Sequence, residues 1–156
     1  MKVYHFTVPE NEELIKHQGL KAACNLAKDA RLPRETLDQR KRCVFAWVKP
    51  EQDERNFGSW DKKVAFAVEV DPDKVQVGSF NVATEMLMHC FTDQKTIDCQ
   101  RWSHIYETTL QTLSDYLRIS NDKTGTNPEV LITEDIPPER ISRVPEYDIK
   151  KEHPFV

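Results

Sequence analysis

The sequence predicts an α+β fold in a single compact domain over residues 1–156. The strands and helices expected along the chain follow one another irregularly, which argues against a regular alternation of strand and helix. The chain has 156 residues, a length at which one hydrophobic core is usual. It holds 9 Pro and only 4 Gly, and it has no low-complexity tract. We therefore expect no long disordered tail.

The first half of the chain is expected to form most of the strands. Residues 2–7 are rich in β-branched and aromatic side chains, which is typical of a strand. Residues 10–18 have helical spacing of Leu14 and Ile15, and Gly19 follows them as a helix-ending residue. Further strands are expected where short apolar runs are bounded by charges or turn residues: 43–48, 64–70 and 75–77. The segments between them are expected to be a loop or short helix over 28–42 and a polar loop over 51–61.

The second half is expected to form two helices and one more strand. Helical spacing predicts a helix over 81–91 and a longer one over 103–117. The apolar stripe of the longer helix would consist of Ile105, Leu110, Leu113 and Leu117. A strand follows at 129–132, and Pro137 and Pro138 then favour a one-turn helix, because proline lacks the N–H that is unpaired at a helix start.

Composition and charge exclude some classes of protein. Mean hydropathy is -0.65, and no apolar run approaches the ~18 residues of a membrane-spanning helix. Met1 to His5 lead into an acidic stretch rather than an apolar one, so we expect no signal peptide and a cytoplasmic location. The formal charge of -4 argues against strong non-specific binding to nucleic acids, which needs many cations. The four cysteines form no CxxC pair, and we expect them to be reduced thiols.

Two sets of polar residues could carry chemistry. His5 and Thr7 are two apart on the first expected strand, so their side chains share a face and could meet a ligand. The alternative, which the residues taken alone favour, is a His and a Thr at a strand end exposed to water. Glu129 opens the strand at 129–132, where a carboxylate could act as a base or stabilise a developing cation. The alternative is a solvated strand end.

Taken together, these segments resemble the NAD-dependent ADP-ribosyltransferases, most closely the DarT-type subgroup of DNA-modifying toxins. The resemblance rests on Tyr4-His5-Phe6-Thr7, on Gly19-Leu20 after the first helix, and on Glu129-Val130-Leu131-Ile132 followed by Ile136-Pro137-Pro138-Glu139-Arg140-Ile141. The matched positions number about a dozen and frame the whole chain. The likeness lies in the order of the motifs, and it implies a split β-sheet with flanking helices.

The resemblance also implies roles for individual residues. His5 would contact ribose hydroxyls of NAD, and Thr7 the ribose on the adenosine side. Gly19 and Leu20 would lie at the nicotinamide, where the N–H and C=O of Gly19 could pair with the carboxamide because no side chain intervenes. Glu129 would be the catalytic carboxylate, which stabilises the positive charge that develops as the nicotinamide–ribose bond breaks.

Other features of the subgroup leave alternatives open. An arginine before the second strand would hold NAD, and either Arg40 or Arg42 fits. The tyrosine that stacks on nicotinamide in many relatives has no clear counterpart, although Phe45 or Trp47 could replace it. The acceptor of ADP-ribose is open between DNA or RNA and protein. We expect no bound metal, because the histidines and cysteines from His89 to His104 lack the tight spacing of zinc ligands. We also expect no membrane partner, because the chain has no long apolar run.

The resemblance therefore implies a toxin-like transferase that moves ADP-ribose from NAD to a macromolecular acceptor and releases nicotinamide. Two alternatives use the same scaffold: an NAD glycohydrolase with water as acceptor, and a non-catalytic binding module. A third is an unrelated α+β protein in which His5 and Glu129 lie far apart.

Overall fold

The computed structural model of the chain shows a mixed fold of strands and helices. It describes residues 1–22, 43–58, 61–90, 93, 95–119 and 127–150. The predicted α+β class is confirmed. Within these residues, no helix is both long enough and apolar enough to cross a membrane.

The strands form one antiparallel sheet in the order β5-β4-β6-β2-β1-β3-β7. The strands have these bounds: β1 Lys2–Thr7, β2 Val44–Trp47, β3 Val64–Glu69, β4 Gln76–Ser79, β5 Gln111–Thr112, β6 Pro128–Ile132 and β7 Ile141–Arg143. All five strands expected from the sequence are present, within two residues of their expected ends. The short edge strands β5 and β7 were not expected.

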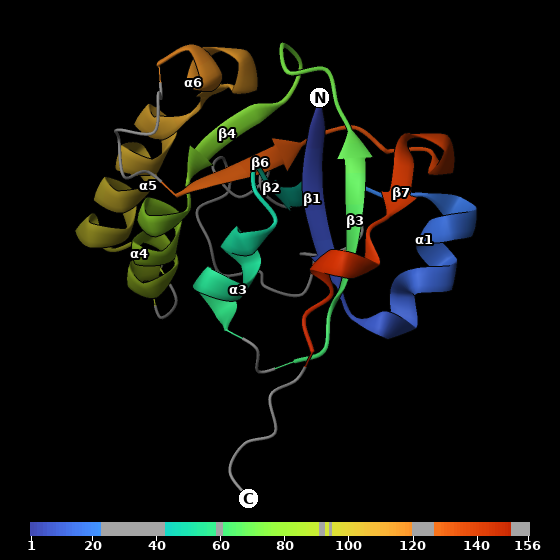
Figure 1. Cartoon of the computed structure of the whole chain (residues 1–156). Helices are drawn as coiled ribbons and strands as arrows, with labels where there is room; N and C mark the ends of the chain where they lie inside the picture. The colour runs from blue at the N-terminus through green and yellow to red at the C-terminus, as the bar shows by residue number, and fades with distance from the viewer. Residues whose placement is uncertain (23–42, 59–60, 91–92, 94, 120–126, 151–156) are drawn as a thin grey trace, which may run out of the picture.

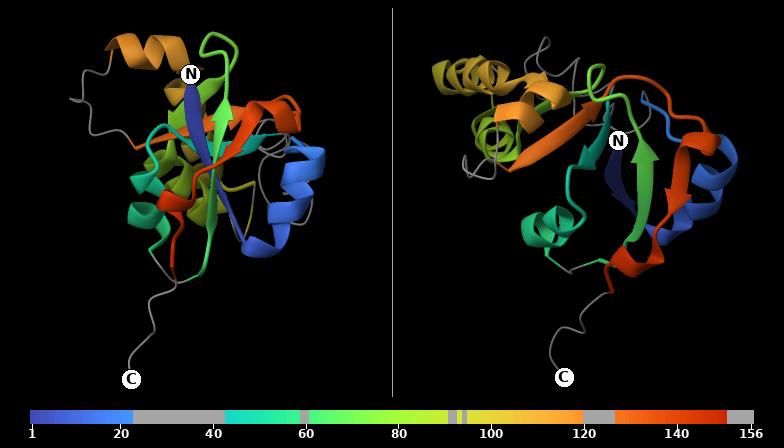
Figure 2. Two further views of the ribbon diagram at one scale, coloured as in Figure 1. Left: turned by 45° about the vertical axis from the view of Figure 1, so that its right-hand side comes forward. Right: turned by 45° about the horizontal axis from the view of Figure 1, so that its top comes forward.

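Helices pack at both ends of the sheet, as Figures 1 and 2 show. The α-helices are α1 Glu12–Gln18, α3 Glu51–Phe57, α4 Phe80–Cys90, α5 Ile97–Thr109 and α6 Leu113–Ile119. Three single-turn helices join them: η1 Pro9–Asn11, η2 Pro138–Arg140 and η3 Pro145–Tyr147. The one-turn helix expected at Pro137 and Pro138 is η2, which is thereby confirmed.

The shortest pairing between neighbouring strands of the sheet is the one between β1 and β2. Strands β1 and β3 pair along six consecutive residues, from Lys2 with Glu69 to Thr7 with Val64. By contrast, the register between β1 and β2 consists of one pair, Tyr4 with Trp47. The strands β4 and β6 run at a wide angle to β1 and β3 (Figures 1 and 2). The structure is therefore a sheet whose groups β5-β4-β6-β2 and β1-β3-β7 are joined at a narrow contact.

A hydrophobic core lies on each face of the sheet. The first is formed by alternate residues of the central strands, together with Ile15 of α1, Leu113 of α6 and Ile136. The second lies between α4, α5 and the other face. Its members are Ala83, Met86, Cys90, Cys99 and Tyr106. Alternation along each strand therefore decides which strand side chains enter the first core.

Two expectations about helices are wrong. The helix expected over 103–117 is two helices, because Leu110 adopts an extended conformation (φ -72°, ψ 129°) and the short strand β5 follows it. The segment 51–61, expected to be a loop, contains α3. This helix has Glu51, Asp53 and Glu54 in its first turn and Gly58 at its end. It has no apolar stripe, and its buried residues, Gln52 and Asp53, are polar.

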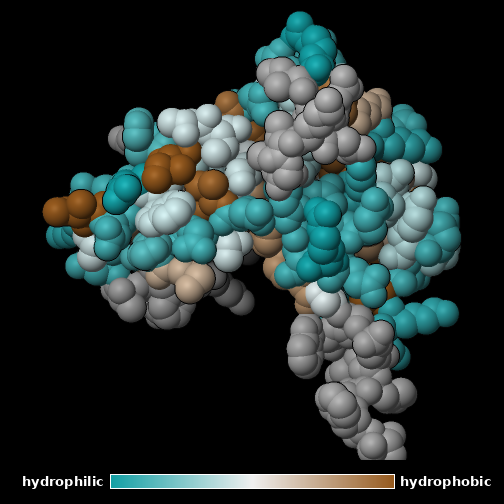
Figure 3. Space-filling model, turned by 60° about the vertical axis from the view of Figure 1, so that its left-hand side comes forward, coloured by the Kyte–Doolittle hydropathy of each residue, from teal (hydrophilic) through white to brown (hydrophobic). Residues whose placement is uncertain are grey.

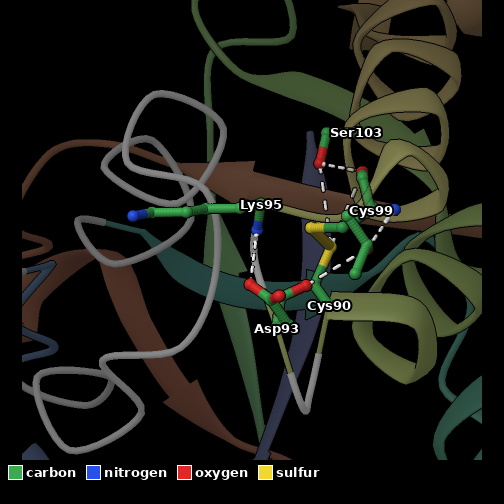
Figure 4. The surroundings of a disulfide bond; sticks show 6 residues. Cys90, Asp93, Lys95, Cys99 and Ser103 are labelled. Carbon is green, nitrogen blue, oxygen red and sulfur yellow. Dashed lines mark hydrogen bonds between the residues drawn. A yellow bond between two sulfur atoms is a disulfide. The ribbon is translucent and has the colours of Figure 1, made fainter.

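The cysteines also depart from expectation. Cys90 at the end of α4 and Cys99 near the start of α5 form a disulfide, so the expectation that all four are reduced thiols is wrong. Figure 4 shows the bond beside Ser103, whose hydroxyl donates to the Cys99 carbonyl oxygen at 2.8 Å. The Thr96 side chain caps α5 by accepting from the Cys99 N–H at 3.1 Å. The disulfide thus ties two adjacent helices together across a short connection.

The outer surface of these helices carries apolar side chains. Figure 3 shows such side chains among the hydrophilic ones on this side of the molecule. The exposed large apolar residues of α4, α5 and α6 are Leu87, Met88, Ile97 and Leu117.

Candidate active site around Glu129 and His5

Glu129 is a buried carboxylate in the middle of the sheet. It is the second residue of β6 and pairs with Trp47 of β2 on one side and Gly78 of β4 on the other. Its side chain is only 2% exposed, so the alternative of a solvated strand end is wrong. The Tyr106 hydroxyl of α5 donates to Glu129 Oε1 at 2.6 Å. The carboxylate is therefore largely removed from water and accepts a hydrogen bond from the phenol of Tyr106.

His5 lies where the two groups of strands meet. Its Nδ1 is 2.8 Å from the carbonyl oxygen of Phe45 on β2. A carbonyl can only accept, so Nδ1 carries the hydrogen and the neutral imidazole has its lone pair on Nε2. Burial lowers the pKa of His5 below its ordinary value, against a smaller opposing effect of the bond to Phe45. A neutral ring is therefore the favoured form near pH 7, and its Nε2 can accept a hydrogen bond from a hydroxyl.

His5 and Glu129 lie on neighbouring parts of the sheet, but their side chains project from opposite faces of it. The pairs Tyr4–Trp47 and Trp47–Glu129 make one row across β1, β2 and β6. Adjacent strands lie about 4.8 Å apart, so the backbones of β1 and β6 are roughly 10 Å apart along this row. His5 follows Tyr4, and alternation places its side chain on the opposite face from Tyr4 and Glu129. Glu129 points toward α5 and bonds to its Tyr106, whereas His5 bonds to the Phe45 carbonyl oxygen of β2.

Thr7 shares the face of His5 on β1. Its hydroxyl oxygen accepts from the Asn11 side-chain amide at 2.9 Å. Thr7 is half-buried, and a hydroxyl that accepts one bond can still donate another.

Gly19 and Leu20 are bound to the segment around Ile136. The backbone N–H and C=O of Leu20 both pair with Ile136, each bond being 2.9 Å long. Gly19 has φ +76°, and a Cβ there would lie 2.0 Å from the Ile136 oxygen. Two motifs of the resemblance, far apart in sequence, thus meet in space.

These bonds change what Gly19 and Leu20 can offer to a ligand. The Gly19 N–H, assigned by the resemblance to the carboxamide, donates instead to the Ile15 oxygen at 2.9 Å and closes α1. The Leu20 side chain is buried in the first core. The glycine is therefore required by the fold itself, through its positive φ and its close approach to Ile136.

Trp47 has its ring fixed by packing and by a hydrogen bond. Its ring centroid lies 5.1 Å from that of Phe80 and 6.1 Å from that of Phe57. The indole N–H donates to Asp53 Oδ1 at 2.9 Å, and Lys63 lies 2.5 Å from Oδ2 of the same carboxylate. Because Trp47 pairs with Glu129, this aromatic group lies on the same face as the carboxylate. Phe45, the other candidate for stacking, contributes its carbonyl to His5.

A polar network fixes α3 beside the start of β6. Asn127 Oδ1 accepts from the side chains of Gln52 and Arg55, at 2.9 Å in each case. Gln52 also accepts from the Lys49 N–H at 2.8 Å. Asn127 is two residues before Glu129, so this network sets the position of the strand that carries the carboxylate.

Some predicted or possible site residues lie elsewhere. Arg40 and Arg42 are outside the described residues. Cys90 and Cys99 are bonded to each other, and the His89 ring stacks on Trp102 with centroids 5.6 Å apart. Over the described part of the chain, no group of three or more His, Cys, Asp or Glu side chains is placed to hold a metal ion.

Tyr106 and Gly78 are the neighbours of Glu129 that the sequence reasoning missed. The stripe predicted for the second helix began at Ile105, but the buried residues of α5 are Cys99, Ser103 and Tyr106. These three have spacings of four and three residues, and this pattern could have identified Tyr106. Nothing in the sequence pairs Gly78 with Glu129, because the order of the strands is not visible there.

Comparisons with protein-family models, with curated proteins and with solved structures found no match for this chain.

Proposed function

We propose that this chain is an NAD-dependent ADP-ribosyltransferase that transfers ADP-ribose to a macromolecular acceptor and releases nicotinamide. The observation that carries the proposal is Glu129, a carboxylate buried at 2% exposure on a central strand. Burying a charged group is costly, and fold stability alone seldom needs it. A desolvated and oriented carboxylate is suited to stabilising positive charge that develops in a transition state.

NAD supplies a nicotinamide–ribose bond whose cleavage leaves positive charge on the ribose carbon. Glu129 would stabilise that charge and accept the proton of the attacking group. Tyr106 donates to its Oε1 at 2.6 Å, which restricts how the carboxylate can turn. Trp47, its partner on β2, gives the same face an aromatic wall.

The second support is the neutral His5 on β1. Its Nδ1 is engaged by Phe45, which orients Nε2 as an acceptor for a ribose hydroxyl. Thr7 follows on the same side of β1 and can add a further polar contact. The His5 and Glu129 side chains leave opposite faces of the sheet, so a dinucleotide that contacts both would have to pass between β1 and β2, where the register is one residue pair.

The third support is the arrangement of the sheet. The resemblance implies a split sheet, and β1 and β2 have a register of one residue pair. The resemblance also rests on Gly19-Leu20 and on the segment that begins at Ile136. These two segments are paired by backbone hydrogen bonds.

Incubating the wild-type chain with labelled NAD and cell lysate tests the proposal. We expect free nicotinamide, together with a mass gain of one ADP-ribose on a nucleic acid or a protein. Free ADP-ribose without a modified partner would instead identify an NAD glycohydrolase. Absence of nicotinamide release would refute both activities.

Binding is tested separately from turnover. NAD should raise the melting temperature of the wild-type chain, because a ligand that binds only the folded state stabilises it. His5→Ala should reduce that shift, whereas His17→Ala, which changes an exposed side chain of α1, should leave it intact. An equal shift in both variants would remove His5 from the site.

A further inference from the structure

The contact between Tyr106 and Glu129 is buried on both sides. Tyr106 is 1% exposed and Glu129 is 2% exposed. The oxygen atoms lie 2.6 Å apart, in the range of hydrogen bonds from a hydroxyl to a charged carboxylate. An ionised carboxylate can only accept, so the Tyr106 hydroxyl is the donor.

Gly78 creates the space for this contact. It lies opposite Glu129 on β4, and a Cβ there would stand 2.9 Å from the Tyr106 hydroxyl and 3.1 Å from Leu110 Cδ2. Gly78 is not among the glycines with positive φ, so its backbone is one that other residues can adopt. The glycine is therefore required for space, and the space is filled by the Tyr106 side chain.

The helix that carries Tyr106 is fixed at both ends. At its start, the disulfide joins Cys99 to Cys90 of α4. At its other end, the Thr109 hydroxyl oxygen accepts from the Ser79 N–H of β4 at 3.1 Å. Ser79 follows Gly78, so the helix is tied to the strand directly beside the contact. The phenol is thus held against Glu129 from two directions.

We propose that Tyr106 is a positioning residue that fixes the orientation of the Glu129 carboxylate for catalysis. This inference rests on the proposed function, in which Glu129 acts on the bond between nicotinamide and ribose. The Tyr106 hydroxyl acts through Glu129 and needs no contact with NAD. Its loss should therefore lower kcat and leave KM for NAD unchanged, because the binding of the ground state does not depend on it.

The test compares Tyr106→Phe with Tyr116→Phe. Tyr106→Phe keeps the ring in the second core and removes the hydroxyl. Tyr116 lies on α6 and is half-buried against the first core, so its variant is the matched control. We expect kcat for nicotinamide release to fall roughly 10- to 100-fold in Tyr106→Phe, the size expected for a lost hydrogen bond to a charged group, and less than twofold in the control.

A double variant separates positioning from general destabilisation. If the hydroxyl acts through the carboxylate, Tyr106→Phe should cause little further loss of kcat in a Glu129→Gln background. A merely structural role would lower the activity of both backgrounds by the same factor. If Tyr106→Phe fails to fold, Gly78→Ala displaces the same hydroxyl from the strand side and should reproduce the loss of kcat.

The outcomes distinguish this inference from the proposed function. A wild-type chain that releases no nicotinamide overturns both. An active wild type with unchanged kcat in Tyr106→Phe, or with equal losses in the two backgrounds, overturns the positioning role alone.

Discussion

Removing the disulfide between α4 and α5 should destabilise the chain by an amount that depends on the number of residues between its two cysteines. Cys90 and Cys99 are separated by 9 residues. In the loop-entropy model, closing a loop of that size removes about 9 cal/mol/K from the unfolded chain, which corresponds to about 2.6 kcal/mol at 25 °C. For a chain of this length, a loss of that size lowers the melting temperature by roughly 5–10 °C.

The assay is thermal unfolding of the wild-type chain and of a variant with Cys90→Ala and Cys99→Ala. Peptide mass spectrometry after alkylation in denaturant provides the control, because these two cysteines should react only after reduction. Both cysteines are fully buried in the folded chain, so the denaturant is needed for the reagent to reach them once they are reduced. Alkylation without reductant, or equal melting temperatures of the two proteins, would refute the reasoning.

Three further predictions concern the glycines and His5. Gly78→Ala should lower the free energy of unfolding by about 1–3 kcal/mol, because a Cβ would lie 2.9 Å from the Tyr106 hydroxyl and would displace it from its bond to the buried Glu129. Urea unfolding against wild type measures this loss, and an unchanged midpoint would contradict it. Gly19→Ala should destabilise by at least about 1 kcal/mol, since φ is +76° and its Cβ would lie 2.0 Å from the Ile136 oxygen; a melting temperature equal to wild type would show that this approach is not required. Stability should fall as pH is lowered below 6.5, the ordinary pKa of histidine, because burial lowers the pKa of His5 and the unfolded chain then binds more protons. The fall should end below the folded pKa of His5 and be smaller in His5→Gln than in wild type, as urea titrations at pH 7.5 and 5.5 would show.

The sequence predicted the elements whose signal is local and apolar. The strands around Val44, Val68 and Val130 carry continuous or alternating apolar side chains, and each lies where it was expected. Helix α3 was missed because polar contacts that are distant in sequence hold it, such as Gln52 with Asn127. The break after Thr109 was missed because no glycine or proline marks it, and because Leu110 continued an apparent apolar stripe.

The candidate site was predictable only in part. Glu129 and His5 were singled out from their residue types on expected strands. Their surroundings depend on strand order, which brings Gly78 and Trp47 to either side of Glu129 and leaves no trace in local spacing. The disulfide was missed for a related reason: its spacing matches no common motif, and only the packing of α4 on α5 brings Cys90 to Cys99.

The most direct test of the central claim is the rate of nicotinamide release from saturating NAD by Glu129→Gln. Glutamine has nearly the same shape and can still accept from Tyr106, so the variant removes the negative charge with little change in packing. We expect the rate to fall by at least about 100-fold, with the NAD-induced rise in melting temperature preserved. Glu85→Gln, at an exposed carboxylate of α4, should stay at the wild-type rate. Turnover by Glu129→Gln at the wild-type rate would contradict the account.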